Sequence, residues 1–347
     1  MQKGMNIFIA VYAVLLVAVL GAAIALPDKP EIAQYAAGAM GIVMFAMAYI
    51  AHRASEAVGN PFNGLVLGSF GSLFRTWLGA AAVAVLAVGI AVGLGFTSID
   101  PDMGWFVESV KSMSAEKGQP LPDNAIPMML NFWRFGSYLG PVFGAPFLAA
   151  LFVLSFLPVY GWLGRRLLTK GLPTTLAVMA GFGLLSSLSG AFVKNPMFET
   201  HNPALAIPVS AVYGVALTLV LFWLFLSSNS AVVPAYFLAV YSAVVGSAQF
   251  YFSDPQAHMV PPTGLADMIV LVIVAAGLWL YKVPDWKRME VAGVSFDGSS
   301  LTSDQLERLE AGRLTRSSGE PARKTAPTEA AAGEAEAETD DSTVSAG

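Results

Sequence analysis

The residues best suited to metal or hydrolytic chemistry are two carboxylates and two histidines, in two short polar segments between apolar stretches. They are Glu199, His201, Asp254 and His258. If both segments lie on one side of a membrane, the four side chains could approach one another, and such a set suits zinc or another divalent ion. No tight spacing motif joins them, so ordinary polar loop residues are the alternative interpretation. We therefore predict no bound metal and no other cofactor.

Other catalytic arrangements have little support in the sequence. The chain contains no cysteine, which excludes disulfides, thiol nucleophiles and cysteine-based metal sites. A serine nucleophile would need a nearby base, and the apolar stretches contain neither histidine nor lysine. Their one ionisable residue, Asp267, falls within the first turn or so of its stretch, so ionisable groups at membrane depth are essentially absent. Because proton, ion and metal chemistry inside a membrane normally depends on such groups, the sequence argues against all three.

The elements that must position these residues are apolar. Hydrophobic residues make up 55% of the 347 positions and charged residues only 12%, about half the ~25% usual for soluble domains. Eight stretches have the ~20 predominantly apolar residues that a membrane crossing needs. They are Ile7–Leu26, Ile32–Ala51, Trp77–Phe96, Tyr138–Leu157, Thr174–Val193, Ile207–Leu226, Val232–Phe252 and Thr263–Tyr281. Isolated strands would leave backbone groups unpaired in lipid, so the sequence predicts an all-α, polytopic transmembrane helical bundle over residues 1–282.

Basic residues in the connecting segments predict the orientation, because cytoplasmic loops carry an excess of Lys and Arg. With the N-terminus inside, nine basic residues fall on the inner side and five on the outer side. The sequence therefore predicts that both termini are cytoplasmic, in a bacterial-type plasma membrane. Ala23-Ile24-Ala25 resembles a signal-peptide cleavage site. The preceding apolar run is long for a signal peptide, so we favour a retained anchor.

The C-terminal part differs in character from the apolar stretches. Residues 282–347 contain 13 acidic and 8 basic residues, against 11 of each in residues 1–281, so the net charge of −5 resides in this tail. Residues 283–315 form a predicted juxtamembrane segment, in which Ser303–Gly312 is predicted to be one short helix with a serine cap and a glycine stop. Residues 316–347 are acidic overall and too polar to bury apolar surface, so we predict disorder. A solvated tail is the simple interpretation, and a docking role is the alternative.

The long outer connection after the third stretch contains a second predicted short helix. In Gly104–Ala115, apolar residues alternate with Glu108 and Lys111. This pattern fits a helix that lies in the membrane interface, with aromatic rings at headgroup level. A surface loop with a short helix is the alternative.

Glycines four residues apart predict sites of helix packing. They are Gly89 and Gly93 in the third stretch, and Gly136, Gly140 and Gly144 at the start of the fourth. Small residues at this spacing form a groove that lets another helix backbone approach closely. We expect packing within the chain, and a homodimer face is the alternative. The sequence does not determine the oligomeric state.

Residues 140–281 carry short motifs in a recognisable order. A GW-x-G frame at Gly161–Gly164 precedes two arginines, SSLSGAFVKNP at Ser186–Pro196 is rich in serine and ends in proline, and SSNSAVVPAYFLAVYSA at Ser227–Ala243 is a polar turn followed by an apolar span. This order resembles the CPBP family of intramembrane proteases, also called the CAAX-protease and bacteriocin-processing family. The family pattern is EE-x-x-W/F-R-G, then W/F-x-x-x-H, then H-x-x-x-N/D, on an eight-helix core.

Every catalytic position that the resemblance implies holds a different residue here. The positions of the paired glutamates, the arginine, the first histidine, the second histidine and the asparagine hold, in that order, Pro158, Val159, Leu163, Lys194, Ala239 and Ala243. In the family, carboxylates and histidines bind a metal or activate water, and no such set remains at these positions. The resemblance therefore implies a pseudo-enzyme that acts by binding.

Three functions are compatible with these observations. The first is a non-catalytic membrane protein that binds a membrane protein or a hydrophobic peptide. The second is an active CPBP-like, metal-dependent endopeptidase with a divergent site, such as the pair His201 and His258. The third is a permease for an uncharged substrate, because the predicted interior is polar but uncharged. The lipid bilayer is an expected partner in all three, and a nucleic acid is not, because no basic patch is present.

Overall fold

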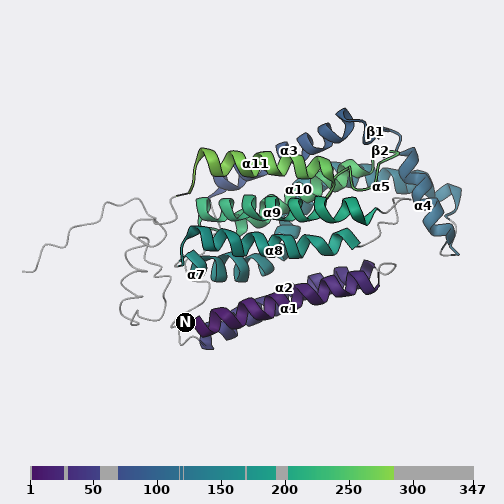
Figure 1. Cartoon of the computed structure of the whole chain (residues 1–347). Coiled ribbons are helices and arrows are strands. Elements are labelled where there is room, and N and C mark those ends of the chain that lie inside the picture. The colour runs from purple at the N-terminus through teal and green to yellow at the C-terminus, as the bar shows by residue number, and fades with distance from the viewer. Residues whose placement is uncertain are drawn as a thin grey trace, which may run out of the picture. The chain divides into compact units, whose positions relative to one another are not determined.

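The computed structural model describes residues 2–26, 30–54, 69–116, 118–119, 121–168, 170–192 and 202–284, which all belong to one compact unit, residues 1–302. These ranges are mostly helical, as predicted (Figure 1). The α-helices are α1 (Gln2–Ala25), α2 (Pro30–Ala54), α3 (Phe70–Gly93), α4 (Gly104–Glu116), α5 (Ile126–Leu139), α6 (Ala145–Phe156), α7 (Arg165–Leu168), α8 (Leu172–Phe192), α9 (Pro203–Ser228), α10 (Val232–Gln249) and α11 (Leu265–Tyr281). The remaining elements are a 3-10 turn, η1 (Asp123–Ala125), the π-helical turns η2 (Gly140–Gly144) and η3 (Leu157–Gly164), and the strands β1 (Ser98–Ile99) and β2 (Phe252–Ser253).

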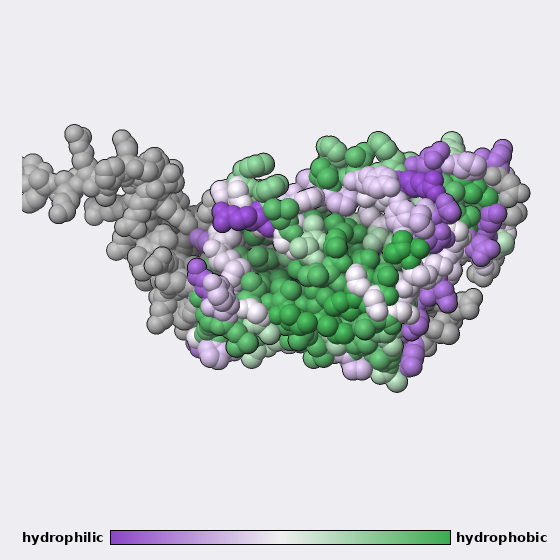
Figure 2. Space-filling model, turned by 90° about the horizontal axis from the view of Figure 1, so that it is seen from above, coloured by the Kyte–Doolittle hydropathy of each residue, from purple (hydrophilic) through white to green (hydrophobic). Residues whose placement is uncertain are grey.

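Five helices in the described ranges are long and apolar enough to cross a membrane. They are Gly4–Ala25, Phe70–Gly93, Ile126–Leu168, Ala204–Ser228 and Val232–Gln249. Three further apolar helices are shorter: Ala39–Arg53, Leu172–Leu188 and Leu265–Tyr281. Each of these eight overlaps one predicted stretch, whereas the eight-span topology and the orientation stay predictions. Figure 2 shows a broad hydrophobic surface on one face, bordered by hydrophilic residues toward both ends, as expected for a protein embedded in lipid.

The fourth predicted stretch, Tyr138–Leu157, is only the middle of a much longer helical segment, Ile126–Leu168. The π-helical turns η2 and η3 interrupt this segment, and each has a proline at its second position, Pro141 and Pro158. Proline has no N–H to donate and its ring crowds the preceding turn. A π turn is wider than an α turn, so it accommodates the proline ring. The helical segment therefore continues past Pro141 and past Pro158, although a proline usually ends an α-helix.

The helices pack as a bundle in which α9 lies beside α8, α10 and α11, while α10 also packs on α3 and α6 (Figure 1). The pair α1 and α2 joins this bundle through α8 and α6. Gly183 on α8 and Gly214 on α9 bring their two helices especially close. A Cβ atom at Gly183 would overlap Thr218 and the carbonyl oxygen of Gly214, and one at Gly214 would overlap Ser187 and the carbonyl oxygen of Gly183. Only glycine at both positions permits this approach of the two backbones.

The glycines predicted to pack helices lie elsewhere. Around the Cβ positions of Gly89, Gly93, Gly136 and Gly144 the described residues place no atom of another element within 4 Å. Gly140 has only the hydroxyl oxygen of Ser247 nearby, at an ordinary contact distance of 3.7 Å. A spacing of four places glycines on one face of a helix but does not decide whether that face meets a neighbour. Of these glycines Gly140 therefore contacts another helix, through Ser247 of α10, whereas helix packing at the other four and the homodimer face stay predictions.

One end of the bundle is closed by short elements. Strands β1 and β2 pair in antiparallel fashion, with Ser98 opposite Ser253. The predicted short helix in the long connection is confirmed as α4, and its Phe106 ring lies 5.7 Å from that of Trp133 and 5.0 Å from that of Phe250, between ring centroids. Helix α4 is therefore held against α5 and the end of α10 by aromatic contacts. Its position in a membrane interface stays a prediction.

The predictions for the C-terminal part fall beyond the described residues. These are the juxtamembrane helix Ser303–Gly312 and the disordered tail, residues 316–347.

Candidate functional site

The predicted polar cluster is only partly within the described residues, because Glu199 and His201 lie outside them. The backbone N–H of Asn202 donates a hydrogen bond to Nε2 of His258 at 3.2 Å, so His258 lies beside Asn202 at the start of α9. That bond occupies a nitrogen lone pair that a metal ion would need. The described ranges contain no group of three or more metal-ligating side chains. A complete four-residue cluster stays a prediction.

The positions that the CPBP resemblance singles out are mostly buried. Pro158, Val159 and Leu163 lie in η3, which is buried from residue 158 to residue 164. Ala239 on α10 is fully buried and Ala243 is half-buried. Lys194 lies outside the described residues. None of the five described positions offers a carboxylate or an imidazole, and their convergence on one cavity stays a prediction.

Asp267 lies deeper than its place in the sequence indicated. It is 0% exposed, and the Tyr241 hydroxyl donates to its Oδ1 atom. Tyr241 precedes the end of α10 by eight residues, which corresponds to roughly 12 Å of helix. The one ionisable residue predicted in the apolar stretches is therefore buried inside the bundle, within the first turn of α11 as predicted.

The reason for this depth is the connection between α10 and α11, which folds into the bundle before α11 begins. Gln249 Nε2 donates to the carbonyl oxygen of Pro261 at 3.1 Å, and the N–H of Leu265 donates to the carbonyl oxygen of His258 at 2.8 Å. Gly264 permits the tight turn, because a Cβ there would overlap the carbonyl oxygen of Val260. Non-helical backbone is tolerated at membrane depth only where the protein buries it. Asp267 lies in the first turn of α11, and its contact with Tyr241 joins α11 to α10.

Two arginines that the sequence placed in a connecting loop are also buried. Arg165 and Arg166 are 6% and 8% exposed. Arg166 hydrogen-bonds Nδ1 of His52 at 3.1 Å and lies 4.3 Å over the centroid of the Trp162 ring. Arg165 donates to the side-chain oxygen of Asn229. Planar guanidinium groups pair well with both aromatic faces and amide acceptors, so these contacts tie α7 to α2 and to the end of α9.

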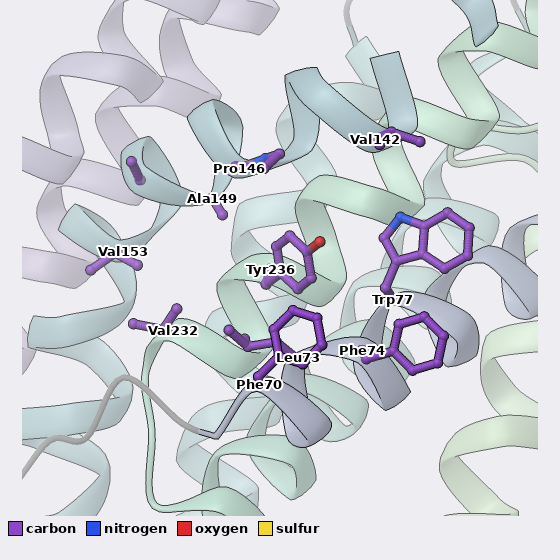
Figure 3. Close-up of a pocket in the computed structure, with 11 residues that line it drawn as sticks. Phe70, Leu73, Phe74, Trp77, Val142, Pro146, Ala149, Val153, Val232 and Tyr236 are labelled. Atoms are coloured by element: carbon purple, nitrogen blue, oxygen red, sulfur yellow. The ribbon is translucent and has the colours of Figure 1, made fainter. Parts of the chain in front are cut away.

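An apolar groove between α3, α6 and α10 is a candidate binding site (Figure 3). Its volume is about 810 Å3. It is lined by Phe70, Leu73, Phe74, Trp77, Val142, Pro146, Ala149, Ala150, Val153, Val232 and Tyr236. Two walls repeat a spacing of i, i+3, i+4 and i+7, from Phe70 on α3 and from Pro146 on α6, which places each set on one helix face.

The groove is hollow because small residues of α6 face large ones of α3. Ala149 forms its floor and is 5% exposed, whereas Phe70 at the rim is 85% exposed. Figure 3 shows Val153, Val232 and Phe70 toward one end of the groove, and Val142 and Trp77 toward the other. A small-to-large difference between facing walls leaves space that neither wall fills.

Two polar groups belong to the groove, and they differ in their bonding. Trp77 Nε1 donates to the carbonyl oxygen of Pro141 at 3.0 Å. The Tyr236 hydroxyl lies among the lining side chains (Figure 3) and has no hydrogen-bond partner among the described residues. The lining residues include no carboxylate, imidazole, amine or thiol. The groove can therefore bind an apolar molecule and offer it one hydroxyl, but it has no acid, base or metal ligand for catalysis.

Comparison of the chain with protein-family models, with curated proteins and with solved structures finds no match. Its function is therefore inferred from its residues and their geometry.

Proposed function

We propose that this protein is an integral membrane protein that binds a hydrophobic molecule of the membrane in the groove between α3, α6 and α10, without hydrolysing it. The observation that carries the proposal is the groove, whose volume of about 810 Å3 is bounded by apolar side chains. That volume lies within the ~300–1,000 Å3 typical of ligand sites. A hydrophobic peptide or an apolar part of a membrane protein belongs to this class of ligand, as does a lipid.

Kinship with the CPBP intramembrane proteases is part of the proposal, as a relative that binds but does not cleave. Its support is the motif order in residues 140–281 and the residue types at the motif positions. Val159, Leu163 and Ala239 are buried aliphatic residues that cannot activate water.

We also propose eight membrane spans with both termini in the cytoplasm. The support is the overlap of eight apolar helices with the eight apolar stretches, together with the excess of basic residues on one side. Because the chain has no cysteine, single cysteines can be labelled without background. In intact cells a membrane-impermeant maleimide should label Asp102→Cys, and should label Lys282→Cys only after permeabilisation. The reverse pattern would refute the orientation.

Photolabelling of the purified full chain in lipid nanodiscs tests the binding proposal. Two probes are used separately: a hydrophobic peptide with a benzophenone group and a phospholipid with a diazirine in its acyl chain. We expect at least one probe to give adducts on the groove residues. Ala150→Phe should fill the groove and reduce these adducts, whereas Ala82→Phe, an exposed alanine of α3 outside the groove, should not. No groove adduct with either probe would refute the proposal.

The same samples separate the alternative functions. Cleavage of the peptide, with a bound metal that is lost in His258→Ala, would identify the divergent hydrolase. Flux of an uncharged solute into vesicles that contain the protein would identify the permease. The binding proposal expects an intact peptide and no flux.

A further inference from the structure

The size of the groove favours a single hydrocarbon chain over a helix. An α-helix with its side chains is about 10–12 Å wide and rises 5.4 Å per turn, so one turn occupies roughly 400–600 Å3. The groove of about 810 Å3 would hold between roughly one and two such turns, whereas a span of ~20 residues has more than five. A partner helix would therefore lie mostly outside the groove. A chain one methylene wide can lie wholly within it.

The position of the groove along the helices matches one leaflet of a bilayer. Phe70 and Val232 are the first residues of α3 and α10, so one end of the groove lies at the end of the bundle. From there it extends about 10 Å along α3 to Trp77, and the wall from Val142 to Val153 is about 16 Å long at 1.5 Å per residue. Half of a ~30 Å hydrocarbon core is about 15 Å. In the proposed orientation this is the inner leaflet.

The Tyr236 hydroxyl indicates what else the ligand carries. Tyr236 lies one turn from Val232 along α10, and its hydroxyl points toward the middle of the groove, on the side of Trp77 (Figure 3). This hydroxyl lacks a hydrogen-bond partner among the described residues. Every other lining residue presents carbon, apart from the Trp77 indole, which already donates to Pro141. An unsatisfied hydroxyl is costly in hydrocarbon, where water is absent. A ligand with an acceptor oxygen at the start of its hydrocarbon chain would satisfy it.

We propose that the groove holds one acyl chain of an inner-leaflet lipid, and that the Tyr236 hydroxyl donates to the ester carbonyl at the head of that chain. This inference rests on the function proposed above and names its ligand. Bulk lipid is as apolar as the groove walls, so burial of the chain supplies little selectivity. The narrow shape of the groove selects a single hydrocarbon chain over a helix. The hydrogen bond from Tyr236 selects an ester-linked chain over an ether-linked one.

Two photoreactive phospholipids that differ only at the chain linkage test the inference. One has an ester-linked and the other an ether-linked diazirine chain, each in nanodiscs with the full-length protein. Adducts on groove residues are counted relative to adducts on the outer face of α3. The adducts on that outer face measure labelling by lipid that surrounds the protein without entering the groove. One net hydrogen bond corresponds to a preference of about two- to tenfold, and we expect the ester lipid to label the groove that much more than the ether lipid.

Substitutions test whether the Tyr236 hydroxyl causes the preference for the ester lipid over the ether lipid. Tyr236→Phe should abolish the preference, because the substitution removes the hydroxyl and keeps the ring. Ala150→Phe should reduce the groove signal of both lipids, and Ala82→Phe should change neither. Equal labelling by both lipids in the unmodified protein, or an unchanged preference in Tyr236→Phe, would overturn the inference.

Failure of the inference is distinguishable from failure of the proposed function. Groove labelling by the peptide probe that is sensitive to Ala150→Phe, without such labelling by either lipid, would refute the lipid chain and leave the binding function in place. Groove labelling by neither probe class would refute both.

Discussion

Replacing Tyr241 with phenylalanine tests the most deeply buried polar contact among the described residues. The substitution removes the hydroxyl that donates to Asp267 and leaves the ring in place. Tyr241 is 1% exposed and Asp267 is 0% exposed, so no water can replace the lost bond. A buried group left without its partner costs about 1–3 kcal/mol, while single hydrogen bonds between membrane helices contribute up to about 1.7 kcal/mol. We therefore expect Tyr241→Phe to lower the free energy of unfolding by about 1–2 kcal/mol.

The assay is reversible unfolding of the purified protein in mixed micelles, with increasing fractions of a denaturing detergent. Tyr236→Phe is the matched control, because its hydroxyl lacks a protein partner among the described residues, and we expect a change within about 0.5 kcal/mol. A double-mutant cycle with Asp267→Asn separates the pairwise contribution from the cost of each substitution alone. If Tyr241→Phe costs no more than Tyr236→Phe, or if the two substitutions in the cycle are additive, the bond does not stabilise the bundle and our reasoning is refuted.

Two further substitutions test the packing of the bundle by the same unfolding assay. Gly214→Ala should destabilise the protein by at least about 1–3 kcal/mol, because its Cβ would overlap α8. Gly89→Ala, in open space, should instead stabilise it by about 0.5–1 kcal/mol; equal effects would contradict the assignment of the close approach. Arg166→Lys should cost about 1–3 kcal/mol, because lysine cannot reproduce both the contact with the Trp162 ring and the hydrogen bond to His52. The matched change at exposed Arg53 should have an effect within about 0.5 kcal/mol, and similar losses at both arginines would show that burial of Arg166 adds nothing.

The sequence alone predicted the apolar helices and their approximate ends. In lipid, backbone N–H and C=O groups can form hydrogen bonds only with one another, so a long apolar stretch must be helical. The predicted stretch Tyr138–Leu157 covers only part of the helical segment Ile126–Leu168, which continues through Pro141 and Pro158. Whether a proline ends a helix or only widens one turn depends on the packing around it, which a local pattern does not contain.

The candidate site was not predictable for a related physical reason. In the helix of a soluble protein, the spacing of the apolar residues shows which face is buried. Helices α3 and α6 are apolar on nearly every side, so this spacing gives no such information. The spacing of Phe70, Phe74 and Trp77 therefore did not stand out. The spacing of glycines likewise defines a shared helix face and not the neighbour that the face meets. The closest approach of two helices lies at Gly183 and Gly214, which the spacing did not single out.

Residue types alone determined that thiol chemistry is excluded and that few ionisable groups accompany the apolar helices, because composition does not depend on folding. Only the tertiary structure decided where those few groups lie. It placed Asp267 against Tyr241 inside the bundle, and it opened a groove beside Tyr236. Depth and concavity arise from contacts between segments far apart in the chain, and no local pattern of residues specifies such contacts.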